Sequence, residues 1–145
     1  MIEFYEDYLD LLDIVNLEMA IRPESSLINM MEHMLKYKYN KSKQTASWIS
    51  TITRSYYELI SNNKIKISDF ELDQLYQESY KRASKENKLP LELKNNKPED
   101  WTIKSLTDEK FIRDFLNDNR NPNPIYYIEI DKFFNSNTKN NKKKK

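Results

Sequence analysis

Apolar residues recur at intervals of three and four along most of the first 116 positions, which is the spacing of helices with one buried face. Four such stretches cover about residues 4–19, 27–39, 45–60 and 72–83. Pro23 separates the first two stretches and lies where the first turn of the second helix is expected. The apolar positions are, in chain order, Phe4, Tyr8, Leu11, Leu12, Val15 and Met19; Leu27, Met31, Met34, Leu35 and Tyr39; Trp48, Ile52, Tyr56, Leu59 and Ile60; and Leu72, Leu75, Tyr76, Ser79 and Ala83.

Local signals mark several helix ends. The residues from Ser68 to Glu71 read Ser-Asp-Phe-Glu, which is a capping box that opens the fourth helix. The chain has no glycine, so a left-handed residue after a helix is expected to be asparagine, and Asn40 and Asn87 lie where two of the patterns stop. The pattern breaks near Pro90, and a short helix resumes with Phe111, Ile112, Phe115 and Leu116.

We therefore predict an all-α fold, a small bundle of about four main helices with a short C-terminal helix and a flexible basic tail. The predicted domain covers residues 1–116. Residues 117–145 are predicted to hold a linker, a short apolar segment and a lysine-rich tail. The apolar segment at residues 125–134 is compatible with a strand, a docking segment or a last helical turn, and residues 65–67 are compatible with an extended conformation.

The amino-acid composition excludes several kinds of functional site. The chain of 145 residues has no cysteine, which excludes disulfides, thiolate zinc sites and cysteine nucleophiles. The absence of glycine excludes glycine-rich phosphate loops, and no cofactor is predicted. No apolar run approaches the roughly 18 residues of a membrane span, and the chain opens without the basic and apolar leader of a signal peptide. We therefore expect a cytoplasmic protein without membrane contact.

Charge is unevenly distributed, although the total is only +1. Residues 1–35 hold eight acidic residues against Arg22 alone, whereas residues 36–54 hold no acidic residue. The simpler interpretation is that acidic and basic faces neutralise each other across the bundle. The alternative is a phosphate-binding surface formed by the lysine tail and the basic residues of this stretch. Those candidate binding residues are Lys36, Lys38, Lys41, Lys43 and Arg54.

His33 is the only histidine of the chain. A metal site on a helix needs a second ligand three or four positions away, and Asn29, Met30, Lys36 and Tyr37 supply neither a carboxylate nor an imidazole. We therefore predict no metal site, and we interpret His33 as a histidine at the edge of the core that bonds to a neighbouring helix. Its alternative role is general acid–base catalysis.

The aromatic residues can either pack in the core or stack against nucleobases. Trp48 shares its predicted helix face with Ile52, Tyr56 and Leu59, which favours a core position over a platform for nucleobases. The predicted structural core includes Leu35, Trp48, Ile52, Tyr56, Leu59 and Trp101.

Three blocks of the chain form an ordered set: His33, Lys36 and Tyr37; then Ser47, Trp48, Thr51 and Ile52; then Pro98, Trp101, Thr102 and Ile103. In this order the blocks resemble the bacterial family named domain of unknown function 29. The resemblance spans about residues 5–116, but Met19 and Ala20 stand where that family has a pair of glutamates, and only Arg54 remains of the arginines after the tryptophan block. It implies a small helical domain in a prokaryotic cytosol and assigns no activity.

Three functions follow as hypotheses. We favour a non-enzymatic protein-interaction module, whose partner is another protein or a second copy, with Met30, Met31 and Met34 as an adaptable contact face. The second hypothesis is a nucleic-acid-associated protein that uses residues 36–54 and the tail. The third is a hydrolase or nuclease centred on His33.

Deletion of residues 139–145 tests the nucleic-acid hypothesis. We expect this deletion to remove most binding to single- and double-stranded oligonucleotides, because an exposed lysine tail attracts any polyanion. Changing Lys38, Lys41 and Lys43 to glutamine in the shortened chain is then expected to add little. Titrations at two salt concentrations measure both effects. Full binding by the shortened chain, lost only in the triple variant, would favour a phosphate-binding surface instead.

Overall fold

The computed structural model describes residues 22–62, 65–122 and 129–134. Within these ranges the chain is helical and contains no strand, which confirms the all-α prediction. The predicted helix at residues 4–19 and the lysine tail lie outside the described residues. The elements are α2 (Pro23–Tyr39), η1 (Lys41–Lys43), α3 (Ala46–Ile60), α4 (Asp69–Ala83), η2 (Leu91–Leu93), α5 (Ile103–Leu106) and α6 (Glu109–Asp118), where η marks a 3₁₀ turn.

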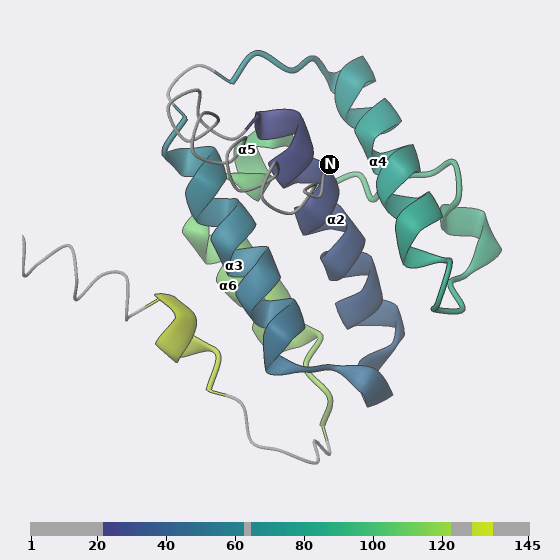
Figure 1. The fold of residues 1–145 in the computed structure, drawn as a ribbon, viewed down its shortest axis with the longest axis vertical. Helices are drawn as coiled ribbons and strands as arrows, with labels where there is room; N and C mark the ends of the chain where they lie inside the picture. The colour runs from purple at the N-terminus through teal and green to yellow at the C-terminus, as the bar shows by residue number, and fades with distance from the viewer. Residues whose placement is uncertain (1–21, 63–64, 123–128, 135–145) are drawn as a thin grey trace, which may run out of the picture.

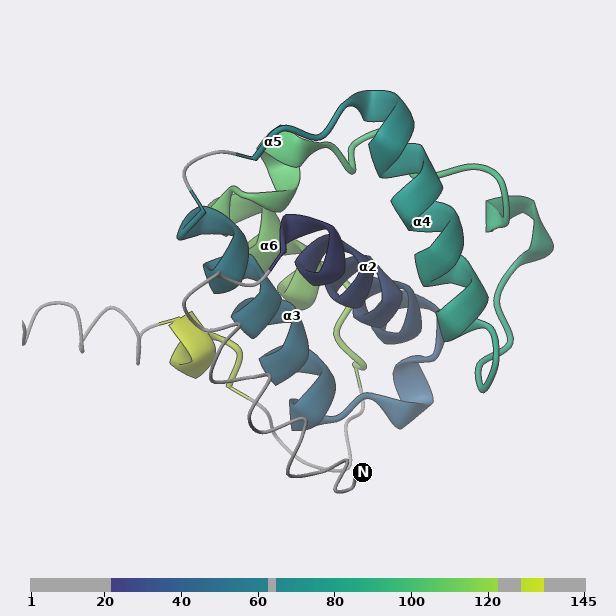
Figure 2. The same cartoon turned by 45° about the horizontal axis from the view of Figure 1, so that its top comes forward.

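Helix α2 is the centre of the bundle. It packs against α3 on one side and against α4 on the other (Figure 1). In the turned view α6 lies behind α2 and α3, and α5 lies above them (Figure 2). The buried positions of α2 occur on more than one face of the helix, as expected for a helix that has neighbours on several sides. The buried apolar residues of α2 are Leu27, Met30, Met31, Met34, Leu35 and Tyr37.

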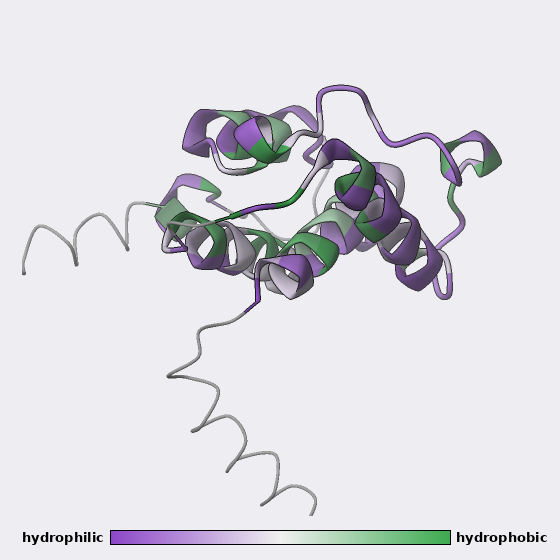
Figure 3. Cartoon of the chain, turned by 90° about the horizontal axis from the view of Figure 1, so that it is seen from above, coloured by the Kyte–Doolittle hydropathy of each residue, from purple (hydrophilic) through white to green (hydrophobic). Residues whose placement is uncertain are grey.

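The predicted methionine contact face is wrong. Met30, Met31 and Met34 are all 0% exposed, so no partner can reach them in the folded domain. Their flexible thioethers fill the space between helices instead. The hydropathy colouring shows apolar and polar residues alternating along each helix, as in helices with one buried face (Figure 3).

The helices begin where the local sequence signals place them. Pro23 occupies the first turn of α2, and the hydroxyl of Thr45 accepts a hydrogen bond from the Trp48 amide at 3.3 Å, which caps α3. At α4 the predicted capping box is confirmed, because Ser68 and Glu71 exchange side-chain and backbone bonds of 3.0 and 3.1 Å. Each such cap stabilises a helix by about 1 kcal/mol.

The predicted face of α3 is displaced at its first turn. Ile49 is 1% exposed and takes the core position that we had assigned to Trp48, which is only partly buried. At the other end Ile60 is 41% exposed, whereas Leu59 is fully buried. The other predicted core side chains, Leu35, Ile52, Tyr56 and Trp101, are buried.

Trp101 lies in the middle of the core, although it comes from an irregular segment between α4 and α5. Its ring meets Tyr76 of α4 and Phe115 of α6 edge to face, with 6.0 Å between ring centroids in both pairs. Phe115 in turn lies 6.1 Å from the ring of Tyr37 on α2. This row of four rings connects three helices through one loop residue, and such edge-to-face pairs add to the stabilisation from burial.

The chain after α6 returns to the bundle. Ile130 and Phe134 are 2% and 0% exposed, and residues 131–134 form a helical turn. Arg113 of α6 forms an ion pair with Asp131 at 2.7 Å and lies 4.4 Å from the centre of the Phe134 ring. This part of the apolar segment is therefore a docked helical turn, and the core extends past the predicted boundary at residue 116. Residues 65–67 are irregular.

Replacing Trp101 by alanine tests the central position of its ring. We expect the Trp101→Ala change to lower the free energy of unfolding by about 3–5 kcal/mol, because it leaves a large cavity among Tyr76 and Phe115. Trp48→Ala is the matched control and is expected to cost clearly less, since its ring is partly exposed. Chemical denaturation measures both, and equal costs would contradict the core assignment.

Candidate functional site

The side of α4 that faces away from the core is polar. Gln74, Gln77, Glu78 and Lys81 follow one another at three- and four-residue spacing, and Gln74, Gln77 and Lys81 are exposed. The opposite side carries Leu72, Tyr76 and the other buried residues of the helix. The helix therefore offers a continuous polar stripe to whatever lies beside it.

Two tyrosines hold the loop after α4 against the helix. The Tyr76 hydroxyl donates a hydrogen bond to the Leu93 carbonyl at 2.8 Å, and the Tyr80 hydroxyl donates one to the Pro90 carbonyl at 3.3 Å. Burial raises the pKa of Tyr76, so its hydroxyl keeps the proton that it donates. Because the two residues are one helical turn apart, they fix both ends of η2 along α4.

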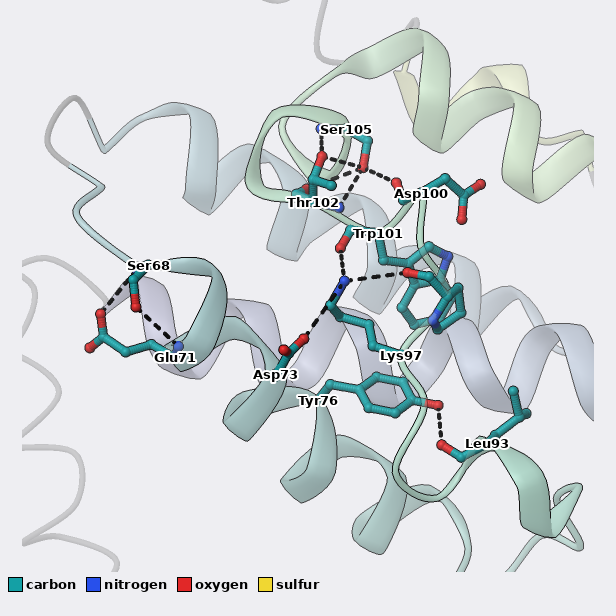
Figure 4. Close-up of polar contacts among 11 residues, drawn as sticks. Ser68, Glu71, Asp73, Tyr76, Leu93, Lys97, Asp100, Trp101, Thr102 and Ser105 are labelled. Atoms are coloured by element: carbon teal, nitrogen blue, oxygen red, sulfur yellow. Dashed lines mark hydrogen bonds and ion pairs between the residues drawn. The ribbon is translucent and has the colours of Figure 1, made fainter.

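Lys97 fastens the second half of the same loop. Its ammonium group donates to the Trp101 carbonyl at 2.7 Å and to the Pro98 carbonyl at 3.3 Å, and lies 3.9 Å from an Asp73 carboxylate oxygen (Figure 4). The side chain is only 14% exposed. Two carbonyls of an irregular segment thereby obtain partners that a helix or sheet would otherwise supply.

Thr102 and Ser105 fix the end of this loop. They form a capping box that opens α5, with bonds of 2.9 and 3.1 Å between side chains and backbone amides. The Ser105 hydroxyl also donates to the Asp100 carbonyl at 2.5 Å (Figure 4). The loop from residue 89 to residue 102 is therefore held at several points along its length.

A groove of about 600 Å³ lies between the polar stripe and this loop, and we call it the α4 groove. The charged side chains of the groove differ in their partners. Glu78 forms an ion pair with Arg82 at 2.8 Å, and the hydrogen bond from Arg82 lowers the pKa of the Glu78 carboxyl. Lys81 and Lys94 are exposed on the two sides of the groove. The groove is lined by Gln74, Gln77, Glu78, Tyr80, Lys81, Ser84, Lys94 and Asn95.

The family model described as domain of unknown function DUF29 matches residues 13–112, which is more than half of the chain. The chain belongs to this family. Comparison with curated proteins and with solved structures gave no match. The whole α4 groove and Trp101 lie inside the matched residues, so the groove is part of the DUF29 domain and not of an addition to it.

The DUF29 domain distributes the predicted basic residues over several elements. Lys36 of α2 forms an ion pair with Glu32 at 3.0 Å, and Arg54 of α3 lies 4.0 Å from Glu58. The ammonium group of Lys38 lies 5.4 Å from the centre of the Tyr39 ring. Lys41 and Lys43 are exposed in η1. Acidic neighbours thus compensate two of the five predicted phosphate contacts.

His33 bonds within its own helix and not to the neighbouring helix that we expected. Its Nδ1 lies 2.9 Å from the Asn29 carbonyl. Burial lowers the pKa of His33 and outweighs the hydrogen bond to Asn29, which raises it; Lys36 lowers the pKa further and Glu32 raises it by smaller effects. The part of the DUF29 domain that the structure describes contains no group of three histidine or carboxylate side chains placed to hold a metal ion.

The α4 groove was missed in the sequence, although one signal for it was present. Gln74, Gln77 and Lys81 form a polar stripe at helical spacing, which normally indicates a solvated face. What the spacing does not reveal is that the following loop comes back along the same helix. Among the described residues, no helix of the DUF29 domain has the length and apolar character needed to span a membrane.

The lowered pKa of His33 predicts a specific pH dependence of stability. Below about pH 6.5 the unfolded chain binds a proton at His33 more readily than the folded chain, so the free energy of unfolding decreases as the pH falls through this range. The effect is absent above it, where His33 is neutral in both states. His33→Gln keeps a side-chain donor for the Asn29 carbonyl and removes the titration. Denaturation curves at about pH 5 and pH 7.5 are expected to differ less for the variant, and an unchanged difference would contradict the assignment.

Proposed function

We propose that this DUF29 domain is a non-enzymatic protein-interaction module that binds an extended segment of a partner chain in the α4 groove. The observation that carries the proposal is the amide lining. Gln74 and Gln77 on the helix and Asn95 on the loop each offer both a donor and an acceptor. Such side chains pair with the N–H and C=O groups of an extended main chain whatever its sequence, whereas a helix has only its end groups left to offer.

The length of the groove suits a short segment. Gln74 and Ser84 are ten residues apart on α4 and its C-cap, which corresponds to about 15 Å of helix. An extended chain advances about 3.3 Å per residue, so about four or five residues fit along the groove. The volume of about 600 Å³ also lies in the usual range of ligand sites.

The loop anchors support tight binding. Because Tyr76, Tyr80 and Lys97 already fix the loop, little conformational entropy is lost when a segment binds. Sites of this kind keep more of their gross interaction energy as affinity. Tyr80 and Ser84 complete the lining, and their hydroxyl groups donate to the carbonyls of Pro90 and Lys81.

The two alternative functions gain no comparable support. For nucleic-acid binding through residues 36–54, the ion pairs of Lys36 and Arg54 with Glu32 and Glu58 reduce the charge available to phosphates. For a hydrolase centred on His33, the hydrogen bond of the ring goes to the Asn29 carbonyl of the same helix and links it to no nucleophile and no carboxylate among the described residues. For the location, the proposal keeps the prokaryotic cytoplasm that the sequence predicts.

Selection of random twelve-residue peptides against the intact chain tests the proposal. We expect selected peptides to lose affinity by about tenfold or more in a Gln74→Ala/Gln77→Ala double variant, because two main-chain contacts worth about 1 kcal/mol each are removed. Calorimetric titration of the selected peptides measures the loss.

Asn117→Ala is the matched control, since Asn117 is an exposed amide on α6, outside the groove. It is expected to bind the peptides as the original chain does. If the selection yields no peptide, or if the double variant and the control bind equally, the α4 groove is not the binding site.

A further inference from the structure

We infer that the partner segment recognised by the α4 groove is acidic, an inference that rests on the function proposed above. The stretch that builds the groove, residues 74–95, contains five basic and three acidic residues. Two of the basic residues, Lys81 and Lys94, line the groove itself, where Glu78 is the acidic residue of the lining.

The one carboxylate of the lining is already engaged. Glu78 accepts a hydrogen bond of 2.8 Å from Arg82, and Lys81 and Lys85 add further positive potential around it. Its negative charge is therefore balanced on the helix surface before any ligand arrives. The charge that remains for a ligand is that of the two lysines of the lining, and this charge is positive.

The positions of these lysines fit a chain that lies along the groove. Lys81 belongs to the helix side, and Lys94 belongs to the loop side. Acidic side chains on opposite faces of an extended segment point away from each other, so neighbouring residues can reach the two walls at once. The amides of the same two walls hold the main chain, while the lysines select the carboxylates.

A single-stranded nucleic acid carries the same sign of charge but fits the lining less well. Such strands are held by bases that stack on exposed aromatic rings. The aromatic residue of the groove, Tyr80, is only 6% exposed and donates its hydroxyl proton to the Pro90 carbonyl. In addition, the amides of Gln74, Gln77 and Asn95 match the alternating donors and acceptors of a peptide backbone, which a phosphodiester chain lacks.

Fluorescence anisotropy with capped, labelled hexaglutamate and hexaglutamine peptides tests the inference on the intact chain. We expect hexaglutamate to bind more tightly than hexaglutamine, with an affinity that decreases as salt is added. Lys81→Gln/Lys94→Gln is expected to weaken hexaglutamate binding about tenfold and to leave hexaglutamine binding nearly unchanged.

The control is Lys142→Gln/Lys143→Gln, which removes the same charge from the tail and leaves the other tail lysines in place. It measures the unspecific attraction of the tail for polyanions, which is screened by salt, so hexaglutamate binding is expected to change by less than about threefold. Each double variant thus loses two lysines, and an unchanged denaturation midpoint verifies that it is folded. Equal loss in the tail variant would overturn the inference, as would equal binding of the two peptides.

Two further outcomes separate the inference from the proposed function. If random-peptide selection yields neutral segments that depend on Gln74 and Gln77, the interaction module stands and its acidic preference falls. The other outcome concerns a labelled six-nucleotide thymidine strand. If it binds as tightly as hexaglutamate, and Lys81→Gln/Lys94→Gln removes that binding, the site recognises polyanions in general. The acidic-peptide inference is then overturned.

Discussion

The burial of Trp101 between Tyr76 and Phe115 is the contact on which the candidate site depends. An irregular segment has few hydrogen bonds of its own, so it stays in place only where side chains anchor it. In this domain one large ring fills the space between α4 and α6, and Lys97 takes up the carbonyl of the same residue. The loop that carries η2 is thereby fixed at its far end, and the α4 groove exists because this loop cannot move away from the helix.

The same row of rings ties the groove to the rest of the bundle. Phe115 contacts Tyr37, whose hydroxyl donates to the Leu116 carbonyl at 2.7 Å and whose pKa is raised to about 12 by burial. The Gln44 amide donates to the carbonyls of Tyr37 and Asn119 at 2.7 and 2.6 Å, which joins the end of α6 to the connection between α2 and α3. Ring packing and hydrogen bonds therefore support each other at the C-terminal end of α6.

Local interactions explain which features the sequence predicted. Caps such as Ser68–Glu71 and the apolar spacing of α2 and α4 act within one or two turns, so the helices and most core positions follow from the pattern. The α4 groove depends on bonds from Tyr76 and Tyr80 to carbonyls 17 and 10 residues away, which no periodicity encodes. The ion pair of Lys36 follows from the sequence, because Glu32 precedes it by four residues, which is one helical turn. The prediction missed this pair because it counted the charges of residues 1–35 and 36–54 separately.

Measurement of backbone order parameters by nuclear magnetic relaxation in the free protein tests most directly whether the groove is preformed. We expect values for residues 91–101 that match those of α4, at about 0.85 as in rigid backbone. Values below about 0.6 in this loop, beside a rigid α4, would show that the anchors of Trp101 and Lys97 do not hold it. The groove would then form only on binding, which would contradict a preformed site.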